Sequence, residues 1–497
     1  MKNIEKALLT LIIIFAGVVV ILLGIKKVNY HCDEIWTYGL ANNIGGINPS
    51  FEIGKTYQGM GPFEDFMTVD ANNKFNYANT WDNQAKDVHP PFYYILIHTV
   101  CSLFSGTFSK WYGIAINIFW MILTLIILYK LLKDIFGNTL AAAGALLAYA
   151  SSVVFFDTML LIRMYAQFTF FVVLLMYVFE KNWDKKPDKP FLIKLGITLF
   201  LGMFTQYYFI FIAFFMCLIY GIKLLAAKDK KCVRNYIVGI GIAGICYGLA
   251  WYHILAHIFN GYRGEEAISK ATNFGGLLSG MVGMFSIIDS EAFAGLGIFF
   301  IILGLGFLIY KILKKDIAPD FTFFMFLCGC FYVVVVGKIC PKITTRYIMP
   351  VSWIFIIASY IVIRFFINKV KAGIISECVV IAVFCVISIF NLASRNFTVP
   401  MDYIDSDQQK AIEIATDKKT LVCVDVNWKI LYDFVILMNT DSYEFIDPEN
   451  AEKYINEQNE DFILIVNLDE GREKLIADFD NELLYEDGMN FYYLVNR

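Results

Sequence analysis

Charged residues are scarce in this chain of 497 residues, since only 17% of them are Asp, Glu, Lys or Arg. A soluble domain carries about 25% charged residues. Hydrophobic residues make up 58% of the chain and aromatic ones 17%, and one water-soluble core cannot bury such a surplus. The composition excludes an ordinary soluble domain. It predicts an integral membrane protein that has no nucleic-acid partner.

Two further absences narrow the class of protein. The eleven cysteines form no CxxC pair, and most of them lie in apolar runs. They are predicted to be small buried hydrophobic residues rather than a disulfide framework or a zinc site, while Cys32, Cys340 and Cys423 lie outside those runs and show no reason to pair. The first apolar run, residues 7–25, lacks a small-x-small cleavage site before Lys26. We therefore expect this run to be an uncleaved first membrane span and not a secretion signal.

Long apolar runs recur along the first 395 residues. A bilayer core of ~30 Å requires about 20 apolar residues per helix, and the runs predict roughly eleven spans. Residues 91–104 are also apolar, but this segment is too short to span and is predicted to be an interfacial helix. The predicted spans centre near residues 16, 121, 147, 171, 199, 216, 245, 301, 328, 356 and 383.

Lysine and arginine gather in alternate connections between these spans, for example at Lys133, Lys231 and Lys315. This is the positive-inside pattern, which places those connections and the N-terminus in the cytoplasm. Lys26 and Lys27 are exceptions at the outer end of the first span, but they precede a long loop, where the rule weakens. The prediction is a multi-pass plasma-membrane protein.

Two large segments face outward in this topology: the first loop, 26–110, and the tail, 396–497. The tail is rich in Asp, Glu and Asn, and strand-like runs at 420–426, 461–467 and 490–495 alternate with helix-like ones. This alternation predicts a small α/β domain. The expected fold is an all-α polytopic membrane domain, 1–395, followed by an extracytoplasmic α/β domain, 396–497.

The first polar motif is His31-Cys32-Asp33-Glu34, a few residues after the first span. At a membrane rim these adjacent carboxylates are partly desolvated, which raises the pKa and the basicity of a carboxylate. Asp33 and Glu34 are therefore candidate catalytic residues. The alternative is a hydrated acidic pair that caps a helix near the membrane.

A second motif, Asp87-Val88-His89-Pro90-Pro91, precedes the short apolar helix. Pro91 suits the first turn of a helix, and Pro90 favours an extended conformation at His89. Asp87 and His89 would then be presented to a polar ligand at the membrane surface. The alternative is that they form an ordinary helix start with its cap.

Two arginines lie at the outer ends of predicted spans. Arg163 stands in an apolar neighbourhood, and Arg346 is followed by Tyr347. A charge at such a depth is costly unless paired, and a guanidinium suits a phosphate or diphosphate. The alternatives are a snorkelling anchor for the arginines and interfacial belts for neighbouring aromatics such as Tyr207.

His253 and His257 are four residues apart and so share one helix face. With a carboxylate they could bind a metal, but two histidines alone make an incomplete site. The sequence predicts no certain cofactor and leaves a divalent metal open.

Taken in order, these motifs resemble those of the GT-C glycosyltransferases, particularly the family-39-like branch related to protein O-mannosyltransferases and aminoarabinose transferase. The matching pattern is Asp33-Glu34 after the first span, HPPxYY at 89–94, RMYA at 163–166 and RYxxP at 346–350. The chain departs from the family at Leu161-Ile162, where many relatives have Glu-Ala.

The resemblance implies transfer of a sugar, with inversion, from a polyprenyl-phosphate donor to an acceptor hydroxyl on a glycan, lipid or protein. Asp33 would remove the hydroxyl proton, Glu34 would orient the acceptor or support Asp33, and the arginines would stabilise the departing phosphate. The expected substrate-binding residues are Asp87, His89, Tyr93, Arg163, Tyr165, Tyr207, Arg346 and Tyr347. The alternative is a lipid or solute transporter or flippase without transferase chemistry, whose signature would be ionisable or broken-helix features near mid-membrane.

Overall fold

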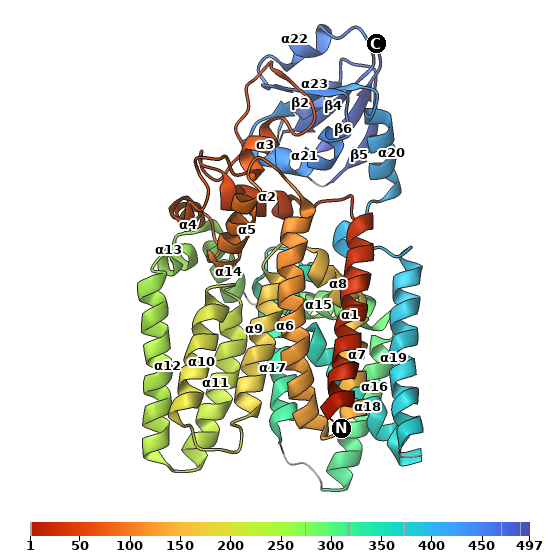
Figure 1. The fold of residues 1–497 in the computed structure, drawn as a ribbon. Coiled ribbons are helices and arrows are strands. Elements are labelled where there is room, and N and C mark those ends of the chain that lie inside the picture. The colour runs from red at the N-terminus through yellow and green to blue at the C-terminus, as the bar shows by residue number, and fades with distance from the viewer. Residues whose placement is uncertain (1, 274, 316–318, 371–372, 469, 488) are drawn as a thin grey trace. The chain divides into compact units, whose positions relative to one another are not determined.

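The computed structural model (Figure 1) describes residues 2–273, 275–315, 319–370, 373–468, 470–487 and 489–497. The chain forms two compact units. The helical unit comprises Met1–Lys26, Val88–Tyr93 and Ile114–Pro400, and the α/β unit comprises Lys27–Asp87, Tyr94–Gly113 and Met401–Arg497. Most of the first loop therefore folds with the tail into one compact unit, whereas Val88–Tyr93 belongs to the helical unit.

The helical unit consists of helices that lie side by side in Figure 1. A helix lies at each of the eleven predicted span centres. The helices are α1 (Lys2–Lys26), α6 (Lys110–Phe136), α7 (Thr139–Ala150), α8 (Val153–Leu160), α9 (Tyr165–Glu180), α10 (Lys189–Met203), α11 (Phe209–Ala226), α12 (Lys230–Ala250), α13 (Ile254–Phe259), α14 (Tyr262–Thr272), α15 (Leu277–Phe293), α16 (Gly297–Leu313), α17 (Phe321–Ile339), α18 (Ser352–Val370) and α19 (Ile374–Ser394), with the 3₁₀ turn η1 (Thr345–Tyr347) before α18.

Within the described residues, seven helices are long and apolar enough to cross a membrane, and the number rises to nine if each of two bent helix pairs forms one span. Their outward-facing side chains are largely apolar, which is expected where lipid replaces water as the solvent. The predicted fold class, a polytopic helical membrane protein with a small α/β portion, is confirmed. The segment predicted to be too short to span forms α5 (Phe92–Leu103), a helix of 12 residues.

Helix α15 lies between the predicted spans centred at 245 and 301, and hydropathy alone did not identify it. It packs closely on α17, since a Cβ atom added at Gly280 would lie 2.8 Å from the carbonyl carbon of Gly337. Small residues permit such a close approach of two backbones in a membrane.

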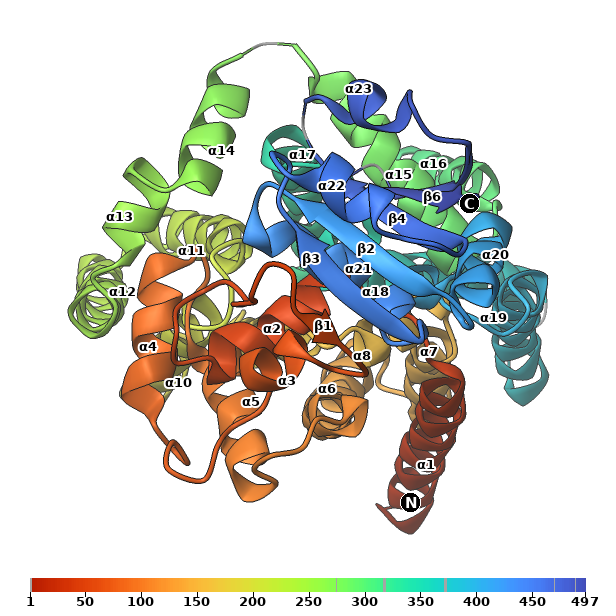
Figure 2. The same ribbon diagram turned by 90° about the horizontal axis from the view of Figure 1, so that it is seen from above.

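The α/β unit is built on one six-stranded sheet with the order β1-β3-β2-β4-β6-β5. Figure 2 shows β3, β2, β4 and β6 side by side in this order. Strands β3, β2 and β4 run parallel, and β1, β6 and β5 are attached antiparallel. The strands are β1 (Thr56–Tyr57), β2 (Lys419–Val424), β3 (Ser442–Ile446), β4 (Phe462–Asn467), β5 (Asn481–Glu486) and β6 (Phe491–Val495).

The helices of this unit come from both the first loop and the tail. The predicted strands of the tail are confirmed as β2, β4 and β6, while β3 and β5 were missed. The helices are α2 (Cys32–Asn42), α3 (Pro62–Met67), α4 (Tyr77–Lys86), α5, α20 (Ser406–Ala415), α21 (Ile430–Leu437), α22 (Ala451–Asn456) and α23 (Arg472–Ile476), with the turns η2 (Pro400–Asp402) and η3 (Asn427–Lys429).

The first loop completes the sheet of the tail. Thr56 and Tyr57 pair with Glu444 and Tyr443, respectively, so β1 covers the edge of β3. The ring of Phe51 stacks on Phe445, with a centroid separation of 4.2 Å. Helix α2 packs on α21 of the tail. The segment that carries the first acidic motif is therefore folded against the C-terminal part of the chain.

Candidate active site

The acidic motif opens helix α2 through a capping box. The Nδ1 atom of His31 accepts a hydrogen bond from the backbone N–H of Asp33, and the Glu34 carboxylate accepts one from the backbone N–H of His31 at 2.9 Å. Two donors that a helix start leaves unsatisfied are thereby paired. The alternative prediction, that the acidic pair caps a helix, is confirmed for Glu34.

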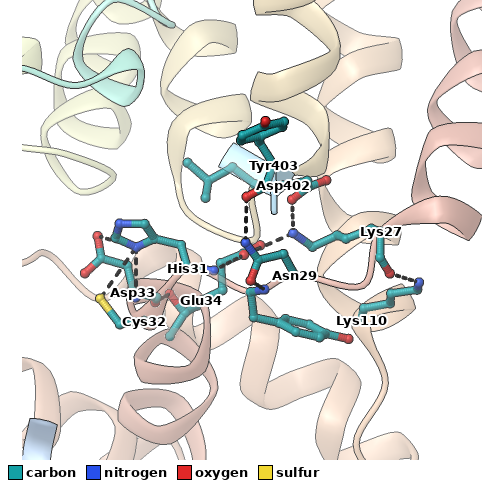
Figure 3. Close-up of polar contacts among 12 residues, drawn as sticks. Lys27, Asn29, His31, Cys32, Asp33, Glu34, Lys110, Asp402 and Tyr403 are labelled. Atoms are coloured by element: carbon teal, nitrogen blue, oxygen red, sulfur yellow. Dashed lines mark hydrogen bonds and ion pairs between the residues drawn. The ribbon is translucent and has the colours of Figure 1, made fainter. Parts of the chain in front are cut away.

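Glu34 is not hydrated, because its side chain is 0% exposed. Its carboxylate accepts a hydrogen bond from Nζ of Lys27 at 3.1 Å, and the same ammonium group donates to Asp402 of the tail (Figure 3). The charge pattern of the sequence left Lys27 as an exception and did not reveal this pairing.

Asp33 differs from Glu34 in its exposure. Its side chain is 17% exposed, and its Oδ2 atom lies 3.6 Å from Nδ1 of His31. Together with Cys32, these side chains offer three metal-ligand atoms within 4.8 Å of one another, and they form the one such group found in the described part of the chain. Imidazole, thiolate and carboxylate are ligands that Zn²⁺ accepts. His253 and His257 do not belong to any such group among the described residues.

The second motif is divided between the two units. Asp87 follows the last turn of α4 in the α/β unit, and its backbone N–H donates to the carbonyl of Asn83. His89 belongs to the helical unit and is half-buried.

Tyr93 is fully buried in the helical unit, where its hydroxyl donates to Oδ1 of Asn117 at 2.9 Å. Asn117 in turn donates through Nδ2 to the carbonyls of Met159 and Leu161, at 3.1 and 2.8 Å. The backbone N–H of Arg163 donates to the same Leu161 carbonyl. Asn117, which was not predicted from the sequence, therefore connects the start of α5 to the segment that carries Arg163.

Arg163 lies in the break between α8 and α9, and Tyr165 is the first residue of α9. Arg163 is 5% exposed and Tyr165 is 3% exposed. The role of Arg163 in holding an anionic group stays a prediction.

Arg346 and Tyr347 lie in the turn η1, which precedes α18. The guanidinium carbon of Arg346 lies 5.3 Å from the ring centroid of Tyr347, a cation–π contact. The Tyr347 ring also packs edge-on against Tyr208 at 5.6 Å. The hydroxyl of the neighbouring Thr345 donates a hydrogen bond to the buried carboxylate of Glu291 on α15. This bond attaches the turn η1 to α15, the helix that hydropathy did not identify.

The hydroxyl of Tyr207 is already engaged within the protein. It accepts a hydrogen bond from the indole Nε1 of Trp251 and lies 2.7 Å from Nδ1 of His257. His257 is therefore hydrogen-bonded to Tyr207 within the protein.

The predicted site residues fall into two groups, and their convergence in one pocket stays a prediction. The α/β unit holds Asp33, Glu34 and Asp87, whereas the helical unit holds His89, Tyr93, Arg163, Tyr165, Tyr207, Arg346 and Tyr347.

Comparison with known proteins identifies both a family match and a shared fold. Residues 88–251 match the family described as dolichyl-phosphate-mannose-protein mannosyltransferase. The structure is similar to that of ArnT from Cupriavidus metallidurans bound to undecaprenyl phosphate, with a TM-score of 0.51 at 10% identity, over 98% of this chain and 97% of that one. The archaeal oligosaccharyltransferase AglB from Archaeoglobus fulgidus, in complex with an inhibitory peptide and a dolichol-phosphate, gives a TM-score of 0.43 at 11% identity, over 96% and 74% of the two chains. No curated protein matches the chain in sequence.

Proposed function

We propose that the chain is a GT-C glycosyltransferase, as the family match over residues 88–251 supports, and that it transfers a sugar from a polyprenyl-phosphate carrier to an acceptor hydroxyl on the outer face of the plasma membrane. The acceptor belongs to a glycan, a lipid or a protein. The observation that carries the proposal is the acidic pair of α2, in which Glu34 is buried and ion-paired while Asp33 keeps contact with solvent.

The lipid donor follows from the proposed topology. Nucleotide sugars are made in the cytoplasm and do not cross a bilayer unaided, so a transferase that acts outside requires a sugar on a lipid that can be moved across. The structurally similar ArnT supports this donor class, since that protein is bound to undecaprenyl phosphate.

The chemistry is a single displacement at the anomeric carbon. Asp33 takes the proton of the acceptor hydroxyl, whose oxygen forms a bond to the anomeric carbon as the bond from that carbon to the lipid phosphate oxygen breaks. The bonding electron pair leaves with the phosphate, and the configuration at the carbon inverts. No carboxylic acid is needed to protonate the leaving group, because a lipid phosphate departs as a stable anion.

Negative charge develops on the departing phosphate, and permanent cations stabilise it in the transition state. We assign this role to Arg163 and Arg346, each of which lies at an interruption between helices of the helical unit. In this proposal Asp87, His89, Tyr93, Tyr165, Tyr207 and Tyr347 line the donor and acceptor sites.

The test replaces the proposed base in cells that lack the chromosomal gene. Asp33→Asn should insert and fold normally but lower transfer by about 10²–10⁴-fold, the contribution of a positioned general base. The measurements are the sugar content of the cell envelope and the amount of lipid-phosphate-linked sugar in the membranes. Asp65→Asn is the matched control, because Asp65 is exposed on α3 of the same unit and loses the same charge. Wild-type transfer by Asp33→Asn would remove Asp33 from the mechanism.

A further inference from the structure

Lys27 is a lysine without access to water. Its side chain is 0% exposed, although it directly follows α1 at the outer end of the first predicted span. Removing an ammonium group from water is strongly unfavourable unless opposite charges surround it. The Nζ atom of Lys27 pairs with Oε2 of Glu34 at 3.1 Å and with Oδ1 of Asp402, whose side chain is 7% exposed.

Two opposing effects act on the pKa of the Lys27 ammonium group. Burial lowers the pKa of the ammonium group, but the charges of Asp402 and Glu34 raise this pKa by more, so Lys27 stays protonated. Burial also raises the pKa of the Asp402 carboxyl, and the attraction of Lys27 opposes that rise. One buried cation is thus shared by two carboxylates, and the loss of either carboxylate leaves the cation incompletely paired.

The three partners join segments that are far apart in the chain. Glu34 is the third residue of α2 and also closes the capping box with the backbone of His31. Asp402 lies 375 residues after Lys27, in the turn η2 that leads into the tail.

Two further hydrogen bonds hold the same junction. Nδ2 of Asn29 donates to the carbonyl of Tyr403 at 2.9 Å, and Nζ of Lys110 donates to the carbonyl of Lys27 (Figure 3). The first turn of α2 is therefore joined to the beginning of the tail through Lys27, which pairs with both Glu34 and Asp402. The Asn29–Tyr403 hydrogen bond adds a second link to the tail, and Lys110 holds the backbone of Lys27.

We propose that Lys27, Glu34 and Asp402 are positioning residues, through which the C-terminal segment fixes the first turn of α2 and thereby the carboxylate of Asp33. The inference rests on the proposed role of Asp33 as the base. It assigns the Glu34 carboxylate to Lys27 and the helix start rather than to the acceptor. It also gives the α/β tail a part in the transfer reaction, because Asp402 belongs to the tail.

The test compares full-length variants in detergent micelles. The donor is the lipid extract of cells that lack the gene, the acceptor is their washed envelope fraction, and the product is polyprenyl phosphate measured by mass spectrometry. Asp402→Asn retains the shape of the side chain but removes one charge, and it should lower kcat about tenfold or more while KM for the donor changes little, as expected for a misplaced catalytic group. Asp402→Glu, which restores the charge, should recover most of kcat.

Hydrogen exchange of the backbone amides distinguishes a local loosening of α2 from unfolding of the whole α/β unit. In Asp402→Asn, the backbone amides of α2 should exchange hydrogen faster while those of β2 and β4 keep their rates. Lys55→Met is the control, because Lys55 forms an exposed ion pair with Glu52 in the same unit, and such pairs contribute little.

The outcomes also distinguish this inference from the proposed function. If Asp33→Asn is inactive while Asp402→Asn and Lys27→Met both retain wild-type kcat per folded molecule, the positioning role is refuted and the proposed function stands. If Asp33→Asn is active, the proposed function fails, and the positioning role fails with it.

Discussion

Gly39→Ala tests how closely α2 packs on α3. The substitution raises the helix propensity of α2, which stabilises it, but it also forces a methyl group against a neighbouring ring, which destabilises it. Alanine favours a helix over glycine by about 1 kcal/mol. A Cβ atom at this position, however, would lie 2.6 Å from Cε2 of Phe66 and still closer to two other ring atoms. Unstrained carbon–carbon contacts are ~3.5 Å or longer. Phe66 lies on α3 and is 1% exposed, so its ring is surrounded by other protein atoms.

Overpacking of a buried site costs about 1–3 kcal/mol. The overlap of the added Cβ with three ring atoms of Phe66 places Gly39→Ala in the upper part of this range, about 2–3 kcal/mol, from which the helix gain of about 1 kcal/mol is subtracted. We therefore expect Gly39→Ala to destabilise the closed state of α2 by about 1–2 kcal/mol, equivalent to about 5- to 30-fold faster hydrogen exchange of the α2 amides. Exchange is measured by mass spectrometry on the full-length protein in micelles.

Two variants complete this design. Phe66→Leu makes room for the added methyl group, so the double variant Gly39→Ala/Phe66→Leu should be less destabilised than the sum of the single changes, with a coupling of about 1 kcal/mol or more. Gly45→Ala is the control, since the nearest atom to its added Cβ lies 3.7 Å away. Slower exchange of α2 in Gly39→Ala, or additive effects of the two changes, would refute the close packing of α2 on α3.

Two further predictions concern the topology and the tail. Reporter fusions after Lys133, Lys315 and Asn396 should report outside only for the last, and a cytoplasmic signal after Asn396 would contradict the proposed topology. Burial raises the pKa of the Asp433 carboxyl to about 8, so between about pH 4 and pH 8 this group is protonated in the folded chain and ionised in the unfolded one, and stability falls as the pH rises through that window. The rate at which the buried Cys423 thiol is labelled reports unfolding, and it should rise with pH more steeply in the wild type than in Asp433→Asn. The same pH dependence in both proteins would exclude Asp433 as the origin of the loss of stability.

Hydropathy made the helical unit predictable, since each of the eleven apolar runs is helical. Helix α15 was missed because Gly280, Gly283, Asp289 and Glu291 interrupt its apolar character. These residues are compatible with a membrane helix only through their tertiary surroundings: Gly280 packs on a neighbouring backbone, and Glu291 accepts a hydrogen bond from Thr345.

The α/β unit shows where local sequence patterns stop being informative. Strand β1 has only two residues, and its partner strand β3 lies at the opposite end of the chain, so neither periodicity nor a turn signal identifies the pairing. The ion pairs of the candidate site could not be predicted from local sequence patterns either. The charge pattern marked Lys27 as an exception, and only the fold reveals that Glu34 and Asp402 neutralise it.

Asn117 illustrates the same point for the helical unit. It lies within an apolar run, and nothing in the sequence distinguishes it from a tolerated polar residue. Its hydrogen bonds to Tyr93 and to the Leu161 carbonyl become apparent only when α5, α6 and the α8–α9 break are placed in space.

The most direct measurement of the central claim is the release of polyprenyl phosphate by the purified full-length protein, incubated with the lipid extract and envelope fraction of cells that lack the gene. We expect wild-type protein to release the lipid phosphate while one sugar appears on the envelope with inverted anomeric configuration, and Asp33→Asn to release almost none. Equal release by the folded Asp33→Asn variant, or sugar transfer without any release of lipid phosphate, would contradict the account.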